Sequence, residues 1–384
     1  MRTWPRAKLT DGMGGLLFAV LMIVPGAYAG ACPDTVLLKP DNRPVKGEVV
    51  KETVDGLVLL DERNNRIEMK WERVSRVQYG VPNPAWEIAV QEFERKNYDS
   101  AAVSCKAVLE DSSLREVVKP CVYRMLAICL SQSGQDDEAA NLFEKLLSNH
   151  PLSSYAPEST DALVGLYLDS EQFGKIRSLA KQLAGAGPYY TVRAVLYEAE
   201  ADLVVAKADL AAARADPAEA RKAEAKMAEV KAKFTKAISA GLSPELLAWA
   251  RVGQAASEVQ PAVSAQAAEQ ALKAPGASKR VQARAHLILG GALRAEAGAL
   301  TGDAAADKHF DAVLEYLRVA MLYAEDKHLA GEALFRAGES FKALARLPGR
   351  RSDRARAAEL FYQVRTQYPG TRWARAAAAT LREM

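Results

Sequence analysis

The spacing of apolar residues changes once along the chain, close to residue 83. Before that point, apolar and polar side chains alternate, so Val36 and Leu38 would share one face of an extended strand. Five such runs lie between Asp34 and Gly80: "TVLLKP", "VKGEVVKE", "GLVLLDE", "RIEMKW" and "RVSRVQYG". Turn-forming pairs such as Asp55-Gly56 separate them. The pattern predicts a small β module over residues 34–80, and closure into a barrel would remove its exposed edges.

Beyond this module the apolar period becomes helical, and one arrangement of residues recurs. In "VYRMLAICLSQSGQDDEAANLFEKLLSNHP" it consists of Ala127, Gly134, Ala139, Phe143 and Pro151. A small residue in each helix lets two antiparallel helices approach closely. Glycine permits a tight turn, the large residue fills the gap toward the next pair, and proline ends the second helix. The pattern therefore predicts pairs of antiparallel helices.

The same arrangement returns near the C-terminus, in "ARAAELFYQVRTQYPGTRWARAAAATLREM". Ala357, Phe361 and Pro369 stand there at the same intervals as in the earlier copy, and a capping helix follows. The segments "WEIAVQEFERKNYDSAAVSCKAVLEDS" and "STDALVGLYLDSEQFGKIRSLAKQLAGAGP" carry weaker copies. A recurring unit of this length predicts a solenoid of stacked helix pairs.

These residues resemble the tetratricopeptide repeat (TPR) motif over most of 84–384, most clearly toward both ends. The longer spacing, with "HPLSSYAPES" after a repeat, resembles the envelope TPR proteins that serve outer-membrane assembly and the Tol–Pal system. The resemblance implies a mainly α fold, a TPR-like α-solenoid after a small SH3-like or Sm-like β module. It also implies a concave groove lined by first-helix positions such as Tyr123, Leu126 and Leu130, although these side chains could instead pack within the helix pair.

An Ala/Glu/Lys/Arg-rich stretch occupies the middle of the chain, from Tyr190 to Ala240. Asp216 suits a helix N-cap and Pro217 the first helical position, which favours two long helices in a hairpin. A coiled coil would need sustained apolar heptad positions, which this stretch lacks. The chain then divides into five parts. They are a signal peptide (1–29), the β module (34–80), TPR-like repeats (84–188), a long hairpin with short helices (189–278), and C-terminal repeats with a capping helix (279–384).

The N-terminus has the features of an export signal. Basic residues precede the apolar run "GGLLFAVLMIV", and Ala27-Tyr28-Ala29 supplies a small-x-small cleavage pattern. The alternative is an uncleaved membrane anchor, for which the run is short. "AGAC", ending at Cys32, also resembles a lipobox, although that pattern prefers leucine where Ala29 stands. We therefore expect a periplasmic location, or the periplasmic face of a membrane if Cys32 is lipidated.

Three further cysteines, Cys105, Cys121 and Cys129, lie in the first repeats. Export permits disulfides. Cys121 and Cys129 are too far apart along one helix to bridge each other. Cys105 and Cys121 would face each other in an antiparallel helix pair, so this pair is the candidate bridge. The alternative is three buried free thiols.

The sequence lacks the motifs of enzymes and of metal or cofactor sites. It contains four scattered histidines, no HExxH, GxSxG, Walker A or dinucleotide fingerprint, and no CxxC. The acidic run from Asp136 to Glu138 fits the start of a helix better than a metal site, because carboxylates favour the positive end of the helix dipole. We therefore expect a non-enzymatic protein without a cofactor.

Charge adds one uneven region to this picture. The 384 residues carry a net charge of +3, which is too small to imply a nucleic-acid partner. Basic residues are concentrated from residue 340 onward, with Arg346, Arg350, Arg351 and Arg354 as a candidate basic patch. This patch could meet an anionic surface, or it could be a set of solvated helix faces.

The sequence thus predicts a protein–protein interaction scaffold of the bacterial cell envelope that acts by binding alone. One alternative is a lipid-anchored structural component of an outer-membrane or envelope assembly, docked through the β module. Another is a protein that binds cell-wall polymer.

Overall fold

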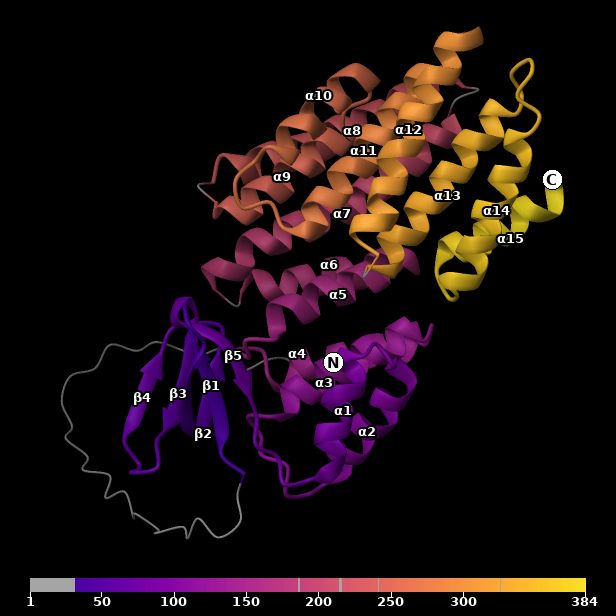
Figure 1. Cartoon of the computed structure of the whole chain (residues 1–384). Coiled ribbons are helices and arrows are strands. Elements are labelled where there is room, and N and C mark those ends of the chain that lie inside the picture. Colours follow the sequence, from indigo (N-terminus) through magenta and orange to yellow (C-terminus); the bar gives the residue numbers. More distant parts are fainter. Residues whose placement is uncertain (1–31, 186, 214–215, 241, 325) are drawn as a thin grey trace.

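The computed structural model describes residues 32–384 except 186, 214–215, 241 and 325 (Figure 1). The predicted signal peptide, residues 1–29, lies outside the described residues. A five-stranded antiparallel sheet comes first, followed by fifteen α-helices in the described residues. The predicted class, a mainly helical repeat fold after a small β module, is confirmed.

The sheet is formed by five short strands in the order β4-β3-β2-β1-β5. Their bounds are β1 (Asp34–Leu38), β2 (Arg43–Thr53), β3 (Gly56–Leu60), β4 (Arg66–Met69) and β5 (Val74–Gln78). The long strand β2 pairs with β1 through its first half and with β3 through its second half, and its register shifts between Val49 and Lys51. Among the described strands no ladder joins β4 to β5, so the edges are not closed by hydrogen bonds as a barrel would require. The 3-10 helix Trp71–Arg73 separates these two strands instead.

A buried ion pair docks the sheet on the first helices. The Asp34 carboxylate is 1% exposed and accepts hydrogen bonds from the backbone N–H groups of Val49 and Gly80, each at 2.7 Å. The Arg115 guanidinium, from the loop before α3, donates to the same carboxylate, with Nη1 at 2.9 Å from Oδ2. The Trp86 indole N–H donates to the Tyr79 carbonyl at 3.0 Å. The β module is therefore anchored by a buried carboxylate as well as by the apolar cluster that it shares with the helices.

A second contact of the sheet depends on pH. Glu52 on β2 accepts a hydrogen bond from the Ser154 hydroxyl, and burial raises the Glu52 pKa to about 7. The folded state thus binds the proton more tightly than the unfolded chain, in which the pKa of Glu52 is near 4.5. The stabilisation is complete below that value and is lost as pH rises toward 7. We expect the stability of the native protein relative to Glu52→Gln to fall between pH 5 and 8 in urea titrations; parallel profiles would contradict this.

The helices follow one another as antiparallel neighbours. They are α1 (Pro84–Glu94), α2 (Tyr98–Glu110), α3 (Lys119–Gln132), α4 (Asp136–Asn149), α5 (Ala156–Asp169), α6 (Phe173–Ala184), α7 (Pro188–Ala212), α8 (Pro217–Ile238), α9 (Pro244–Ala256), α10 (Pro261–Leu272), α11 (Lys279–Ala297), α12 (Gly302–Leu322), α13 (Lys327–Leu344), α14 (Asp353–Gln367) and α15 (Arg372–Glu383). The Ala-rich middle forms the long hairpin of α7 and α8. The Asp216 side chain caps α8 by accepting from the Ala218 N–H at 2.8 Å.

Helix pairs pack through a glycine in one helix against an aromatic ring in its neighbour. A Cβ built at Gly338 of α13 would lie 2.7 Å from the ring of Phe361 on α14. A Cβ built at Gly290 of α11 would likewise lie 2.7 Å from the ring of Tyr316 on α12. The rings of Phe361 and Tyr316 are fully buried. The absence of a side chain on one helix thus creates the space that the aromatic side chain of the next helix fills.

This packing predicts the effect of adding one methyl group. Gly338→Ala is expected to lower the free energy of unfolding by about 1–3 kcal/mol, because overpacking displaces the Phe361 ring. Gly331→Ala on the same helix is the control, since its Cβ would meet Tyr368 at an ordinary 3.4 Å. The control should be neutral or stabilising, because alanine favours helix over glycine. Equal stability of the two variants in chemical denaturation would refute the packing argument.

Candidate functional site

From α3 onward, the first helix of each helix pair faces a common cavity of about 780 Å³. Side chains from α3, α5, α7, α9, α11 and α13 line it, and the alternate helices mostly lie outside it. The array of helix pairs is curved (Figure 1), and the pair α3–α4 contacts the last helices of the chain. The cavity is therefore the concave face of the solenoid, narrowed by contact between its ends.

The two ends meet at tight backbone turns. The turn between α3 and α4 contains Gly134, and the turn between α14 and α15 contains Gly370. A Cβ on Gly370 would lie 3.1 Å from the Gly134 carbonyl oxygen, so the two backbones are in contact. Both residues have φ in the left-handed region, +81° and +85°, where glycine is favoured. We call this junction, with the polar contacts around it, the seam.

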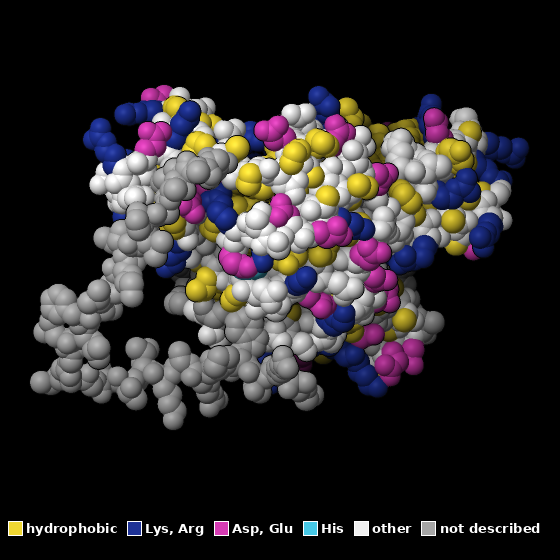
Figure 2. Space-filling model, turned by 90° about the horizontal axis from the view of Figure 1, so that it is seen from below, with side chains coloured by type: hydrophobic (Ala, Val, Ile, Leu, Met, Phe, Trp, Pro, Cys, Tyr) yellow, Lys and Arg dark blue, Asp and Glu magenta, His cyan; other side chains and the backbone are white. Residues whose placement is uncertain are grey.

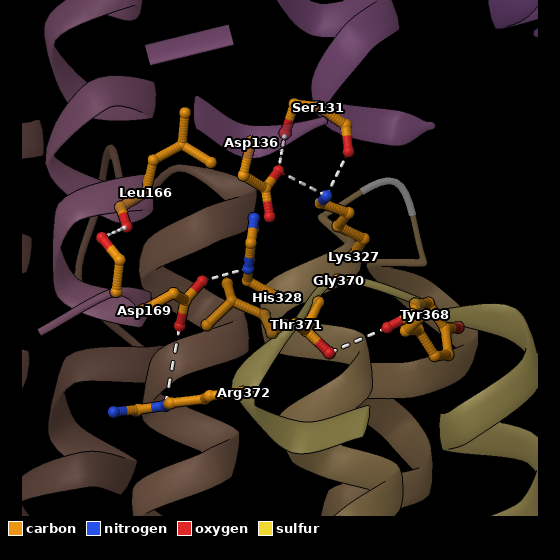
Figure 3. A network of polar contacts seen from close by, with 12 residues as sticks. Ser131, Asp136, Leu166, Asp169, Lys327, His328, Tyr368, Gly370, Thr371 and Arg372 are labelled. Carbon is orange, nitrogen blue, oxygen red and sulfur yellow. Dashed lines mark hydrogen bonds and ion pairs between the residues drawn. The ribbon is translucent and has the colours of Figure 1, made fainter. Parts of the chain in front are cut away.

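Lys327, at the start of α13, makes the most buried polar contact of the seam. Its side chain is 5% exposed, and its ammonium donates to the Ser131 carbonyl and, at 2.7 Å, to Asp136 Oδ1 (Figure 3). Ser131 ends α3 and Asp136 begins α4. The acidic start of α4, expected from the sequence to favour the helix dipole, thus also supplies the ion-pair partner of Lys327.

A second contact of the seam centres on Asp169, at the end of α5. His328 Nδ1 lies against one carboxylate oxygen of Asp169, and Arg372 Nε lies 3.6 Å from the other (Figure 3). His328 belongs to α13 and Arg372 to α15, so one carboxylate receives two side chains from the far end of the chain. Figure 3 shows the three groups converging between these helices.

The seam is held by polar contacts without a shared apolar core. The largest cluster of buried apolar residues runs from the sheet along the array to α11. Two others join α11 to α13 and α13 to α15, and the fourth lies near α3 and α4. In the part of the chain that the structure describes, no cluster joins α3–α5 to α13–α15. Opening the seam would therefore expose little buried apolar surface.

The predicted groove residues lie in the core. Tyr123, Leu126 and Leu130 of α3 are 8%, 3% and 3% exposed, and none of them lines the cavity. Tyr123 packs with Leu146 and Ala156. The cavity-lining residues of α3 are instead Arg124, Ile128, Ser131 and Gln132. The apolar face of α3 packs against neighbouring helices, and its more polar face lines the cavity. Charged residues on the first helix of each pair were the sequence signal that could have indicated this.

The candidate disulfide is absent, since the structure holds Cys105, Cys121 and Cys129 as free thiols. Cys105 and Cys129 are buried. The Cys121 thiol lies in hydrogen-bond contact with Tyr155, and burial raises its pKa to about 11. The sequence correctly placed these cysteines in neighbouring helices, but their side chains pack as small apolar groups. Cys32, the candidate lipidation site, is exposed at the start of the described residues.

The candidate basic patch lies on the turn between α13 and α14. Arg346, Arg351 and Arg354 are exposed. Arg350 lies over the Phe310 ring at 4.8 Å, and its Nη1 is 3.9 Å from Asp353. Figure 2 shows charges of both signs interspersed on the face seen there, with Lys and Arg more frequent toward its right-hand end. Binding of an anionic surface by this patch stays a prediction.

The described residues show neither a metal site nor a membrane-spanning helix. Within the described ranges, no three or more His, Cys, Asp and Glu side chains are grouped so that they could hold a metal ion. Nor does any described helix combine the length and the apolar character needed to cross a bilayer. The cavity, with its seam, is therefore the candidate functional site.

Comparison with known proteins identifies the two repeats that meet at the seam. The tetratricopeptide repeat family model matches residues 122–153, which contain α4 and most of α3, and residues 332–371, which contain α14 and most of α13. No curated protein matches the chain. Among the solved structures, one titled "Computational Design of Self-Assembling Cyclic Protein Homooligomers" matches at 14% identity, covering 78% of this chain and 99% of its own, with a TM-score of 0.17 that supports no structural argument. Two segments that match the tetratricopeptide repeat model thus lie on either side of the seam.

Proposed function

We propose that this protein is a non-enzymatic interaction scaffold of the bacterial cell envelope, which holds a segment of a partner protein in its cavity. Tetratricopeptide repeats bind protein or peptide partners, and they use their concave face as a binding surface. The observation that carries the proposal is that both matched repeats border one cavity of about 780 Å³.

The cavity wall suits recognition of a polar segment. Charged residues of both signs line it, including Arg124 and Glu158 on one side and Arg336 and Glu332 on another. Apolar side chains such as Ile128 lie between them. Alternating charge and apolar surface favours specific partners through complementarity, because a mismatched charge in such a site is costly.

The envelope location rests on sequence features. The basic start, the apolar run and Ala27-Tyr28-Ala29 fit an export signal, and the repeats resemble those of envelope proteins. In this proposal the β module docks the scaffold on an envelope assembly. Lipidation of Cys32 would anchor it, and the basic patch would contact an anionic surface such as lipid headgroups or wall polymer.

Site-specific crosslinking in living cells tests the scaffold function. A photoreactive residue at Ile128, which lines the cavity, should capture one dominant envelope protein, identified by mass spectrometry. The matched control carries the photoreactive residue at Val103 of α2, which is 70% exposed and does not line the cavity. Capture of the same proteins at both positions, or none at Ile128, would refute binding in the cavity.

The lipid-anchored alternative is separated by the mass of the mature chain. A lipidated protein should begin at Cys32 and carry the added mass of its acyl groups. A free periplasmic protein should begin near residue 30 without added mass. Intact-mass spectrometry of protein purified from membranes and from the soluble fraction distinguishes the two.

A further inference from the structure

A cluster of cations converges inside the cavity, away from the seam contacts of Lys327. Lys207 comes from α7, Arg336 from α13 and Arg372 from α15, and all three line the cavity. Each acts electrostatically on the carboxylate of Glu332 on α13. Desolvation alone would raise the pKa of Glu332, but these cations hold it below its ordinary value. The surroundings of Glu332 therefore favour negative charge.

The two arginines of the cluster are held in place. Arg336 Nε donates to Glu332 Oε1 at 2.7 Å. The guanidinium groups of Arg336 and Arg372 lie over the Trp373 ring, 5.5 and 4.6 Å from its centroid. A planar guanidinium fixed against an aromatic face loses little conformational freedom when it binds a planar anion. The arginines are thus arranged before any ligand arrives.

Lys207 differs from the two arginines because it makes no direct contact with a carboxylate of the described residues. Glu332 pairs with Arg336, and Asp169 lies beside Arg372. Within the described residues, by contrast, Lys207 has no hydrogen bond or ion pair. Its side chain is exposed to the space inside the cavity, yet protein surrounds it. Desolvation and the neighbouring Arg336 lower its pKa to about 8, and the attraction of Glu332 only partly offsets them.

We propose that Lys207, Arg336 and Arg372 form a binding site for an anion, a carboxylate or phosphate group carried by the ligand of this cavity. Arginine pairs with both groups through two parallel hydrogen bonds, and lysine adds a point charge. The cavity volume lies in the range of sites for small organic ligands. The inference deepens the proposed function by naming the chemistry recognised in the cavity, and it rests on the cavity being the binding surface.

The carboxylate or phosphate could belong to a free small molecule or to an acidic side chain of a bound protein segment. Isothermal titration calorimetry of the purified protein distinguishes these sources with three probes: inorganic phosphate, succinate and a short tri-glutamate peptide. Each titration is run at constant ionic strength set with chloride. We expect saturable binding of at least one probe, which chloride does not reproduce.

The variant that tests the site is Lys207→Met, which keeps the aliphatic stem and removes the charge. Loss of one charge-assisted contact should weaken probe affinity about ten- to hundredfold. Lys279→Met is the matched control, because Lys279 lines the same cavity outside the cluster. Binding of succinate or phosphate that is lost only in Lys207→Met supports a small-molecule ligand, and loss of peptide binding alone supports a protein-borne acid. No saturable binding, or equal affinity in both variants, overturns the proposal.

A second readout follows the lysine itself. Nuclear magnetic resonance of isotopically labelled lysine should give Lys207 a pKa near 8 in the free protein, and saturation with a binding probe should raise it, because an adjacent anion favours the ammonium form. An unchanged value at saturation overturns the assignment. Failure of anion binding would leave capture of a partner at Ile128 intact, and failure of that capture would leave anion binding intact.

Discussion

Replacement of Arg115 by methionine is expected to release the β module from the helices. The variant leaves the Asp34 carboxylate, which is fully buried, without its cationic partner. Breaking a buried pair by removing one member costs about 3–5 kcal/mol, because the remaining charge is uncompensated. The free energy of unfolding from urea titration should fall by this amount. Hydrogen exchange should show faster exchange in β1 and β5 than in α13 or α14.

The matched control lies in the same sheet. Arg66 pairs with Glu68 at 2.7 Å, but both side chains are more than 60% exposed. Arg66→Met should change stability by less than about 1 kcal/mol, since exposed pairs contribute little. If Arg115→Met proved as mild as Arg66→Met, the buried ion pair would not be what anchors the sheet.

Lys327→Met is expected to open the seam while the helices stay folded. The variant removes the ammonium that joins the Ser131 carbonyl to Asp136, and the methionine side chain still fills the space of the lysine stem. The lost pair is worth on the order of 3 kcal/mol, because Lys327 is almost fully buried. Circular dichroism should be unchanged, and the radius of gyration from small-angle X-ray scattering should increase.

Lys222→Met serves as the control for this variant. Lys222 pairs with Glu219 at 2.6 Å on the outer surface of α8, with both side chains largely exposed. Its removal should leave the radius of gyration unchanged. An identical scattering profile for Lys327→Met and the native protein would show that the polar seam does not hold the ends together.

The local architecture was predictable because its signals are local. The alternation before residue 80 and the spacing of Ala127, Gly134 and Phe143 each report on contacts between neighbours in sequence. The glycine–aromatic packing of Gly338 and Phe361 also follows from adjacent helices. Repeat proteins are built from such nearest-neighbour contacts, so sequence patterns are informative about them.

The closed form of the array was not predictable from those patterns. Lys327 and Ser131 are 196 residues apart, and their contact depends on curvature accumulated over the intervening helices. A small change in rotation at each pair would separate the ends. The sequence also does not reveal that Lys207, in an ordinary Ala/Glu/Lys-rich stretch, faces Arg336 across a cavity.

The sequence did not show which face of α3 lines the cavity. The sequence leaves open whether Tyr123, Leu126 and Leu130 of α3 line a groove or pack within the helix pair, and the structure shows that they pack. In a curved array the concave face is where polar side chains from several helices meet. Arg124 and Ser131, between those apolar positions, are the residues that reach the cavity.

We expect the pair α3–α4 to lie against α15 in solution, and this contact can be measured as a distance between the two. Nitroxide labels at the exposed residues Asp137 of α4 and Arg375 of α15 would lie on opposite sides of the seam. Labels introduced through encoded keto amino acids avoid the exposed Cys32. Double electron–electron resonance at low salt should give one short, narrow distance distribution that lengthens in Lys327→Met. A long, broad distribution in the native protein under the same conditions would contradict the account.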